Sequence, residues 1–332
     1  MGVASEYPEN SMSAYRAAAE QGYDVIELDL GYTADKKIVT LHDDTINRTA
    51  SPAYGTGPTK EIRINDITYT EALKYDLGIG VSNKFRGEKI PLFDDVLTLA
   101  KSEGIRLKID NKIQKFSYEM LGILFELLTP YQDLISITSN DIEFIKKCLK
   151  RLPNTAIDYD GEVTANTLNE LSALIPRERL TVWLPFECRR TSWVRVPFAD
   201  EESASKIKNF AKLGIWIIDN YADFYKATER FNPDIIETDG TIKPFKNCGI
   251  IYDMHTHSEN SHDSTCPVTD MKKSAESRGL KGFAVTDHCD IEYCETIDLD
   301  KVLSGSTHDA QSANESGGVE VIKGVEMGEA FW

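Results

Sequence analysis

The chain has 332 residues, of which 41% are hydrophobic and 27% are charged, and it carries a net charge of −17. This length exceeds one typical domain, and the composition supports a large apolar core. The negative charge argues against nucleic acid or an anionic membrane as a partner, since both bind basic surfaces. The sequence has no apolar run of about 18 residues that could span a membrane. It also lacks the basic start of a signal peptide, so we expect a cytoplasmic protein.

Short β-rich segments, several of them nearly continuous in Val, Ile and Leu, alternate with amphipathic helical segments. This alternation predicts parallel strands in an α/β fold, and acidic residues at strand ends favour a TIM barrel over an open sheet. The predicted strands are Tyr23–Leu30, Ile38–His42, Ile105–Asp110, Leu134–Ser139, Thr155–Tyr159, Leu180–Leu184, Gly214–Asp219 and Asp234–Asp239. The predicted helices are Ser11–Gln21, Phe93–Ser102, Tyr118–Leu128, Asp141–Arg151, Thr164–Ala173, Glu201–Leu213 and Ala222–Arg230.

Two segments interrupt this regular pattern. The polar stretch Asn47–Arg86 is long enough to predict a functional loop or a small insertion. After Pro244 the pattern restarts behind a short linker, Lys246–Gly249, and we therefore predict two domains, 1–245 and 250–332. The second shows only three strands and one helix, which suggests an incomplete α/β domain: Ile250–His255, Pro267–Ser277, Gly282–Asp287 and Val319–Met327.

Acidic and basic side chains follow the early strands of the first domain. The period of a strand places Glu27 and Asp29 on one face, where two carboxylates suit a divalent cation such as Mg²⁺ or Ca²⁺. An amphipathic strand with both acids in water is an equally good interpretation. His42 follows a strand and could transfer protons, although a lone histidine is more often structural. Asp110 and Lys112 could bind metal and phosphate, or form a solvated pair.

The order of these residues is more specific than any one of them. P-E-N-S, I-E-L-D-L, H-D-D-T-I-N-R-T, G-E-K-I-P-L, G-I-W-I-I-D and D-I-I-E-T-D occur in that order over residues 2–245. Together they resemble the glycerophosphodiester phosphodiesterase family, metal-dependent TIM barrels that release glycerol 3-phosphate and an alcohol. The resemblance implies that Glu27, Asp29 and Asp110 bind the metal, with Asp110 replacing a longer glutamate. It also implies that Lys112 binds the substrate phosphate and that His42 is catalytic.

One departure from the family concerns the first barrel strand. The family's first strand ends in His-Arg-Gly, whereas this sequence begins at Met1 and Gly2 aligns with that glycine. We therefore expect a barrel that lacks its first strand, and a chain that is a fragment with little or no diesterase activity. A barrel without one strand has two unpaired edges.

A second set of metal-type side chains follows the strands of the C-terminal segment. His255 and His257 alternate at a strand end, a common geometry for Zn²⁺, Mn²⁺ or Fe²⁺. T-D-H ends the next strand at His288, and G-V-E ends the third at Glu326. Scattered polar residues in an acidic tail are the weaker interpretation.

This segment resembles the start of the polymerase and histidinol phosphatase (PHP) family of metal-dependent phosphoesterases over residues 250–329. The resemblance implies that His255, His257, Asp263, His288 and Glu326 are metal ligands, and His262 could replace Asp263. Since later ligands of that family are missing, we expect no phosphatase activity from this segment. In an intact parent protein, the two domains could act in turn on a phosphodiester and its monoester product.

The sequence thus predicts a hydrolase that takes a small glycerophosphodiester from phospholipid breakdown. One alternative is a non-catalytic fragment that binds glycerophosphodiesters or metal. Another is that the acidic C-terminal segment is an interaction module. The head group, the metal and the oligomeric state stay open.

Overall fold

A computed structural model describes residues 1–50, 58–187, 194, 196–243, 252–277, 279–289 and 298–327. The chain divides into two compact units, Met1–Ile242 and Lys243–Trp332. The linker predicted at Lys246–Gly249 lies outside the described residues, so the exact boundary stays a prediction. Among the described residues, no helix is long and apolar enough to cross a membrane.

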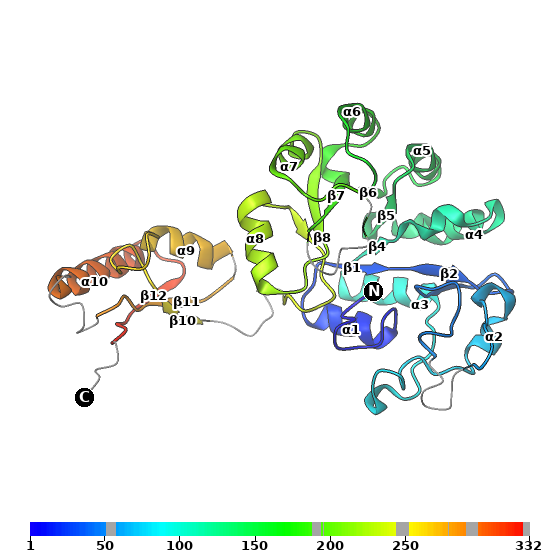
Figure 1. Cartoon of the computed structure of the whole chain (residues 1–332), viewed down its shortest axis with the longest axis horizontal. Helices are drawn as coiled ribbons and strands as arrows, with labels where there is room; N and C mark the ends of the chain where they lie inside the picture. Colours follow the sequence, from blue (N-terminus) through cyan, green and yellow to red (C-terminus); the bar gives the residue numbers. More distant parts are fainter. Residues whose placement is uncertain are drawn as a thin grey trace. The chain divides into compact units, whose positions relative to one another are not determined.

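The first unit contains a parallel sheet whose strands are joined by helices, which confirms the predicted parallel α/β architecture. Its strand order is β1-β4-β5-β6-β7-β8-β9, and helices α4 to α8 lie around its outer side (Figure 1). The strands are β1 (Val25–Leu28), β4 (Arg106–Ile109), β5 (Ile135–Ser139), β6 (Ala156–Tyr159), β7 (Leu180–Pro185), β8 (Lys212–Trp216) and β9 (Ile235–Ile236). The longer helices are α1 (Met12–Glu20), α3 (Phe93–Glu103), α4 (Tyr118–Leu128), α5 (Ile142–Arg151), α6 (Ala165–Leu174), α7 (Glu201–Lys208) and α8 (Tyr221–Phe231).

The two faces of this sheet differ in polarity. Alternate residues such as Leu107, Ile137 and Val182 are fully buried in the main hydrophobic core of the unit. The residues between them, including Lys108 and Thr181, line an internal cavity. The apolar runs in the sequence therefore do not mark strands that are apolar on both faces.

Two predicted strands take a different form in the structure. The segment Tyr23–Leu30 is interrupted at Asp29, after which β2 (Leu30–Tyr32) pairs antiparallel with β3 (Ile38–Thr40). The segment predicted at Ile38–His42 thus belongs to a separate two-stranded hairpin and is not a barrel strand. The following insertion has a small core of its own and contains α2 (Tyr69–Ala72).

The element boundaries predicted from the sequence were wrong around the end of α7. This helix ends at Lys208, and β8 already begins at Lys212, whereas the sequence predicted a helix to Leu213 and a strand from Gly214. Leu213 and Ile215 are both fully buried, because they pack outward from β8. An apolar residue that ends a helical pattern cannot be distinguished by periodicity from one that starts a buried strand.

The described residues of the second unit form a parallel sheet of order β10-β11-β12 together with helices α9 and α10. Helix α10 was not predicted from the sequence. Its 17 residues are rich in Ser, Asp and other small polar side chains, which have weak helix propensity. It is anchored by buried Ala310 and Ala313 in the core of the unit. The elements are β10 (Tyr252–Thr256), α9 (Val268–Ser277), β11 (Gly282–Val285), α10 (Leu299–Glu315) and β12 (Glu320–Lys323).

Candidate metal centres and active site

Three carboxylates meet at one edge of the first sheet. Glu27 lies on β1, Asp29 directly follows β1, and Asp110 directly follows β4. Strands β1 and β4 are parallel neighbours with Glu27 opposite Lys108, so their carboxyl ends coincide. One oxygen from each of the three acids lies within 4.8 Å of the others. The sequence therefore predicted a set of carboxylates that the fold brings together.

Burial changes the protonation of these acids. It raises the pKa of Glu27 to about 7, and the charge of Asp29 adds to the rise, while the α-amino group of Met1 pairs with the Glu27 carboxylate. Burial and the charge of Asp29 also raise the pKa of Asp110. Although burial acts in the opposite direction, the Lys112 ammonium holds the pKa of Asp29 below its usual value.

Lys112 and His42 lie beside this cluster and line the same cavity, which has a volume of about 460 Å³. Lys112 Nζ donates to Asp29 Oδ1 at 2.7 Å and to the main-chain oxygen of His42 at 2.5 Å. An ammonium has three N–H groups, so these two hydrogen bonds use two of them within the described part of the chain. The His42 ring is half-exposed, and its Nδ1 lies 2.6 Å from Asp43 Oδ1.

Asp29 has a buried hydrogen-bonding partner, Asn10, that was not predicted from the sequence. The Asn10 amide donates to Asp29 Oδ2 at 3.0 Å, and its oxygen accepts from the Asp29 N–H at 3.2 Å. Tyr15 fixes that same oxygen with a hydrogen bond of 2.8 Å. The P-E-N-S motif contained Asn10, but nothing in its spacing indicated this contact.

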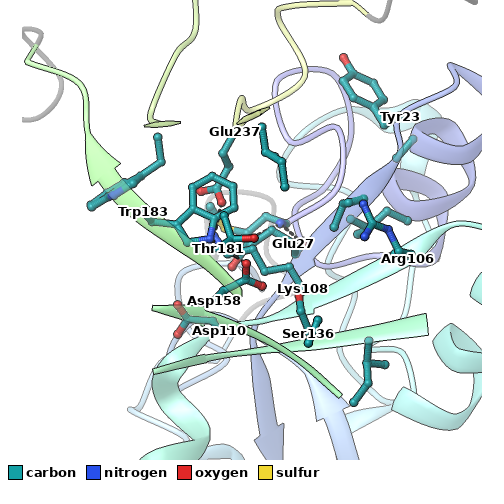
Figure 2. Close-up of a pocket in the computed structure, with 18 of the residues that line it drawn as sticks. Tyr23, Glu27, Arg106, Lys108, Asp110, Ser136, Asp158, Thr181, Trp183 and Glu237 are labelled. Carbon is teal, nitrogen blue, oxygen red and sulfur yellow. Dashed lines mark hydrogen bonds and ion pairs between the residues drawn. The ribbon is translucent and has the colours of Figure 1, made fainter. Parts of the chain in front are cut away.

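Sequence analysis also missed a charged cluster inside the barrel. Figure 2 shows Lys108, Glu237, Asp158 and Trp183 around the cavity next to Glu27. Lys108 forms an ion pair with Glu237 and lies 3.9 Å from the centre of the Trp183 ring. The Trp183 indole donates to Asp158 Oδ1 at 2.8 Å. Strand alternation could have placed these side chains inside, but their pairing depends on the sheet order.

The donor set of the first unit fits a hard divalent cation. Three carboxylates offer only oxygen ligands, which Mg²⁺ and Ca²⁺ prefer. Burial raises the pKa values of Glu27 and Asp110, and a cation bound between the acids would favour their ionised forms.

The second unit gathers its predicted ligands at the ends of its three strands. His257 Nδ1 lies 2.8 Å from Asp263 Oδ2, and His257 Nε2 lies 2.8 Å from Glu326 Oε2. His255 Nε2 lies 3.2 Å from Glu326, and His288 Nε2 lies 3.5 Å from Asp263. His257 therefore belongs to two overlapping groups of potential ligands, one with His255 and Glu326 and one with Asp263 and His288.

This donor set differs chemically from the first. It combines imidazole nitrogens with carboxylates, which suits Zn²⁺, Mn²⁺ or Fe²⁺. Although burial opposes it, the hydrogen bond that His257 donates to Asp263, together with the charge of that carboxylate, raises the pKa of His257. The ring of His262, the alternative ligand, lies 4.8 Å from the ring of His288. Asp263, and not His262, belongs to the potential ligand group with His257 and His288.

Sequence comparison places both units among known domains. The model of the glycerophosphoryl diester phosphodiesterase family matches residues 2–169, and the PHP domain model matches residues 253–331. A glycerophosphodiester phosphodiesterase of Caldanaerobacter subterraneus is 37% identical over 111 residues, or 33% of this chain and 42% of that protein. A glycerophosphodiester phosphodiesterase of Bacillus altitudinis is 27% identical over 179 residues, which cover 46% of this chain and 70% of that protein. The chain spans less than half the length of the first curated relatives it matches.

Solved structures share the fold of the first unit. An Oleispira antarctica phosphodiesterase in complex with the product sn-glycerol-3-phosphate has a TM-score of 0.57 and 20% identity, covering 72% of this chain and 91% of that one. A glycerophosphoryl diester phosphodiesterase of Parabacteroides distasonis has a TM-score of 0.54 and 19% identity, covering 70% and 78%. These likenesses support the TIM-type barrel, and the match over residues 2–169 shows that the chain belongs to the glycerophosphoryl diester phosphodiesterase family.

Proposed function

We propose that the first unit hydrolyses glycerophosphodiesters to glycerol 3-phosphate and an alcohol. The observation that carries this proposal is the convergence of Glu27, Asp29 and Asp110 with Lys112 and His42 on one cavity. The chain's membership of the family supplies the reaction class. The substrate is a small molecule, and the cytoplasmic location stays a prediction.

The proposed roles follow from the chemistry of each side chain. Glu27, Asp29 and Asp110 would hold Mg²⁺ or Ca²⁺, which when bound withdraws charge from the phosphoryl oxygens. The remaining N–H of Lys112 donates to a phosphate oxygen, while its other two stay on Asp29 and the main chain at His42. When both ring nitrogens of His42 carry a proton, the ring delivers the Nε2 proton to the oxygen of the leaving alcohol and keeps the Nδ1 proton that faces Asp43.

The test is release of glycerol 3-phosphate from glycerophosphocholine by the purified chain, with Mg²⁺ or Ca²⁺ and with a chelator. We expect slow, metal-dependent release that falls by about a further hundredfold in Glu27→Gln. Glu119→Gln, which changes an exposed carboxylate outside the cavity, is the matched control. Metal uptake without any product would contradict hydrolysis and favour the alternative of a binding protein.

We further propose that the second unit binds a transition-metal ion through His255, His257, Asp263, His288 and Glu326. The five side chains form one connected set at three strand ends. A competition titration with a chromophoric zinc chelator tests this, and loss of Zn²⁺ uptake is expected in His257→Ala. Unchanged uptake in that variant would contradict it.

A further inference from the structure

The His42 ring ends a line of four polar side chains at the mouth of the cavity. His42 Nδ1 contacts Asp43 Oδ1 at 2.6 Å, and Arg48 Nε donates to Asp43 Oδ2 at 2.6 Å. Arg48 Nη1 and Nη2 donate to the two oxygens of Glu9 at 2.7 and 2.6 Å. Glu9 precedes α1, so the line joins the loop after β3 to the N-terminal segment.

Arg48 is committed to these two carboxylates. It also donates from Nη2 to Asp43 Oδ1 at 3.1 Å, so Arg48 forms two hydrogen bonds with each of the two acids. Four of the five N–H groups of a guanidinium are therefore used. An arginine beside a phosphate site would ordinarily be assigned to the phosphate, but here two acids already satisfy it.

The contact with Arg48 sets the state of Asp43. The hydrogen bonds that Arg48 and His42 donate to Asp43 lower its pKa to about 2, although burial acts in the opposite direction. Asp43 is thus an ionised acceptor near neutral pH. An ionised acceptor at Nδ1 favours the tautomer whose proton is on Nδ1, because the partner of one ring nitrogen decides which nitrogen carries the proton.

We infer that Arg48 is a positioning residue for His42: held by Glu9, it fixes Asp43 so that His42 carries its proton on Nδ1 and presents Nε2 to the substrate. Lys112 donates to the main-chain oxygen of the same histidine, so both its ring and its backbone are held by hydrogen bonds. This inference rests on the role proposed for His42. It assigns to Arg48 no contact with the substrate.

The test reads the tautomer directly and needs neither substrate nor metal. Long-range ¹H–¹⁵N spectra of the full chain with ¹⁵N-labelled histidine are recorded at alkaline pH, and the His42 signals are identified by their loss in His42→Gln. We expect the Nδ1–H form to dominate in the parent chain. In Arg48→Ala and Asp43→Ala we expect a mixture of both tautomers.

Further variants keep the test decisive. Arg48→Lys preserves the charge but not the paired hydrogen bonds, so we expect a mixture there too. Glu9→Ala leaves Arg48 and Asp43 intact and should give a smaller shift in the same direction, even if Arg48→Ala does not fold. Arg230→Ala removes an exposed arginine paired with Glu201 and should leave the tautomer unchanged.

Three results would overturn the inference: an Nε2–H tautomer in the parent chain, an unchanged tautomer in Arg48→Ala, or the same shift in Arg230→Ala. A chain that hydrolyses nothing can still pass this test, so failure of the proposed function is seen separately. Loss of inorganic phosphate binding in Arg48→Lys with an unchanged tautomer would instead make Arg48 a phosphate ligand.

Discussion

The chemistry of Glu27 depends strongly on its surroundings. Burial raises its pKa to about 7, so near neutral pH the Glu27 carboxyl group is protonated in a fraction of the protein molecules. In those molecules a cation must displace this proton in order to bind. A carboxyl group binds metal only in its ionised form. Metal binding to the first unit is therefore linked to the titration of one side chain.

This linkage predicts a pH dependence of metal affinity. Below the pKa of about 7, binding releases one proton, so the apparent Mg²⁺ affinity should rise about tenfold per pH unit from pH 5.5 and level off above pH 7. Titration calorimetry at several pH values would measure it. A flat profile across this range would show that Glu27 is not protonated before the metal binds.

Lys108 and Glu237 form an ion pair that is largely buried, with side chains 11% and 26% exposed. The pKa of Lys108 is raised by Glu237 although burial opposes the rise. Lys108→Met should lower the free energy of unfolding by about 3 kcal/mol, since it leaves Glu237 as an uncompensated charge. Urea unfolding would measure this loss. The double variant Lys108→Met, Glu237→Leu should recover most of it, and a double variant no more stable than the single one would contradict this account.

At the scale of single residues, the sequence predicted side chains at or just after the carboxyl ends of strands better than contacts made by loop residues and by side chains in the middle of strands. Glu27, Asp29 and Asp110 could be placed together because neighbouring parallel strands end at one edge. Asn10 could not be placed beside Asp29, since a buried amide contact depends on how a loop turns back on the sheet.

At the scale of elements, buried Asp287 connects the parts of the second unit. Its carboxylate accepts from the Ser258 hydroxyl at 2.6 Å and from Ser306 on α10, and its main-chain oxygen accepts from the Glu326 N–H at 3.2 Å. Ser258 follows His257 in the sequence, so one acid steadies the neighbours of several candidate ligands.

Removing this acid should weaken metal binding without removing a ligand. We expect Asp287→Ala to lower the Zn²⁺ affinity of the chain about 10- to 100-fold, because supporting hydrogen bonds orient metal ligands. Competition with a chromophoric chelator would measure the affinity. Lys273→Ala, which alters an exposed pair on α9, serves as control and should have no effect. Equal affinities in Asp287→Ala and the parent chain would refute the role.

Predictions of elements succeeded where apolar periodicity was strong. Helices α4 and α5 match their predicted ranges closely, since Leu124, Leu128, Phe144 and Ile145 mark a buried face. Helix α10 escaped detection because its buried side chains are mostly small, and tertiary contacts rather than propensity hold it.

At the scale of the whole molecule, the two units have separate hydrophobic cores and chemically different donor sets. We expect Zn²⁺ to stabilise the second unit by about 2.7 kcal/mol at a hundred times its dissociation constant. Thermal unfolding with and without Zn²⁺ would report this as an upward shift of the transition that contains the second unit. The shift should vanish in His257→Ala and persist in Glu27→Gln, and loss of the shift in both would contradict independent sites.

The two-faced strands of the first sheet have a consequence for how the chain folds. A slip of one residue in strand pairing exchanges the two faces of a strand. In β4, such an error would push Lys108 among the helices and turn Leu107 and Ile109 toward the charged interior. Because mispairing of β1, β4 or β6 would bury Glu27, Lys108 or Asp158 in apolar surroundings, the polar interior that serves the site also discourages misfolded arrangements of these strands.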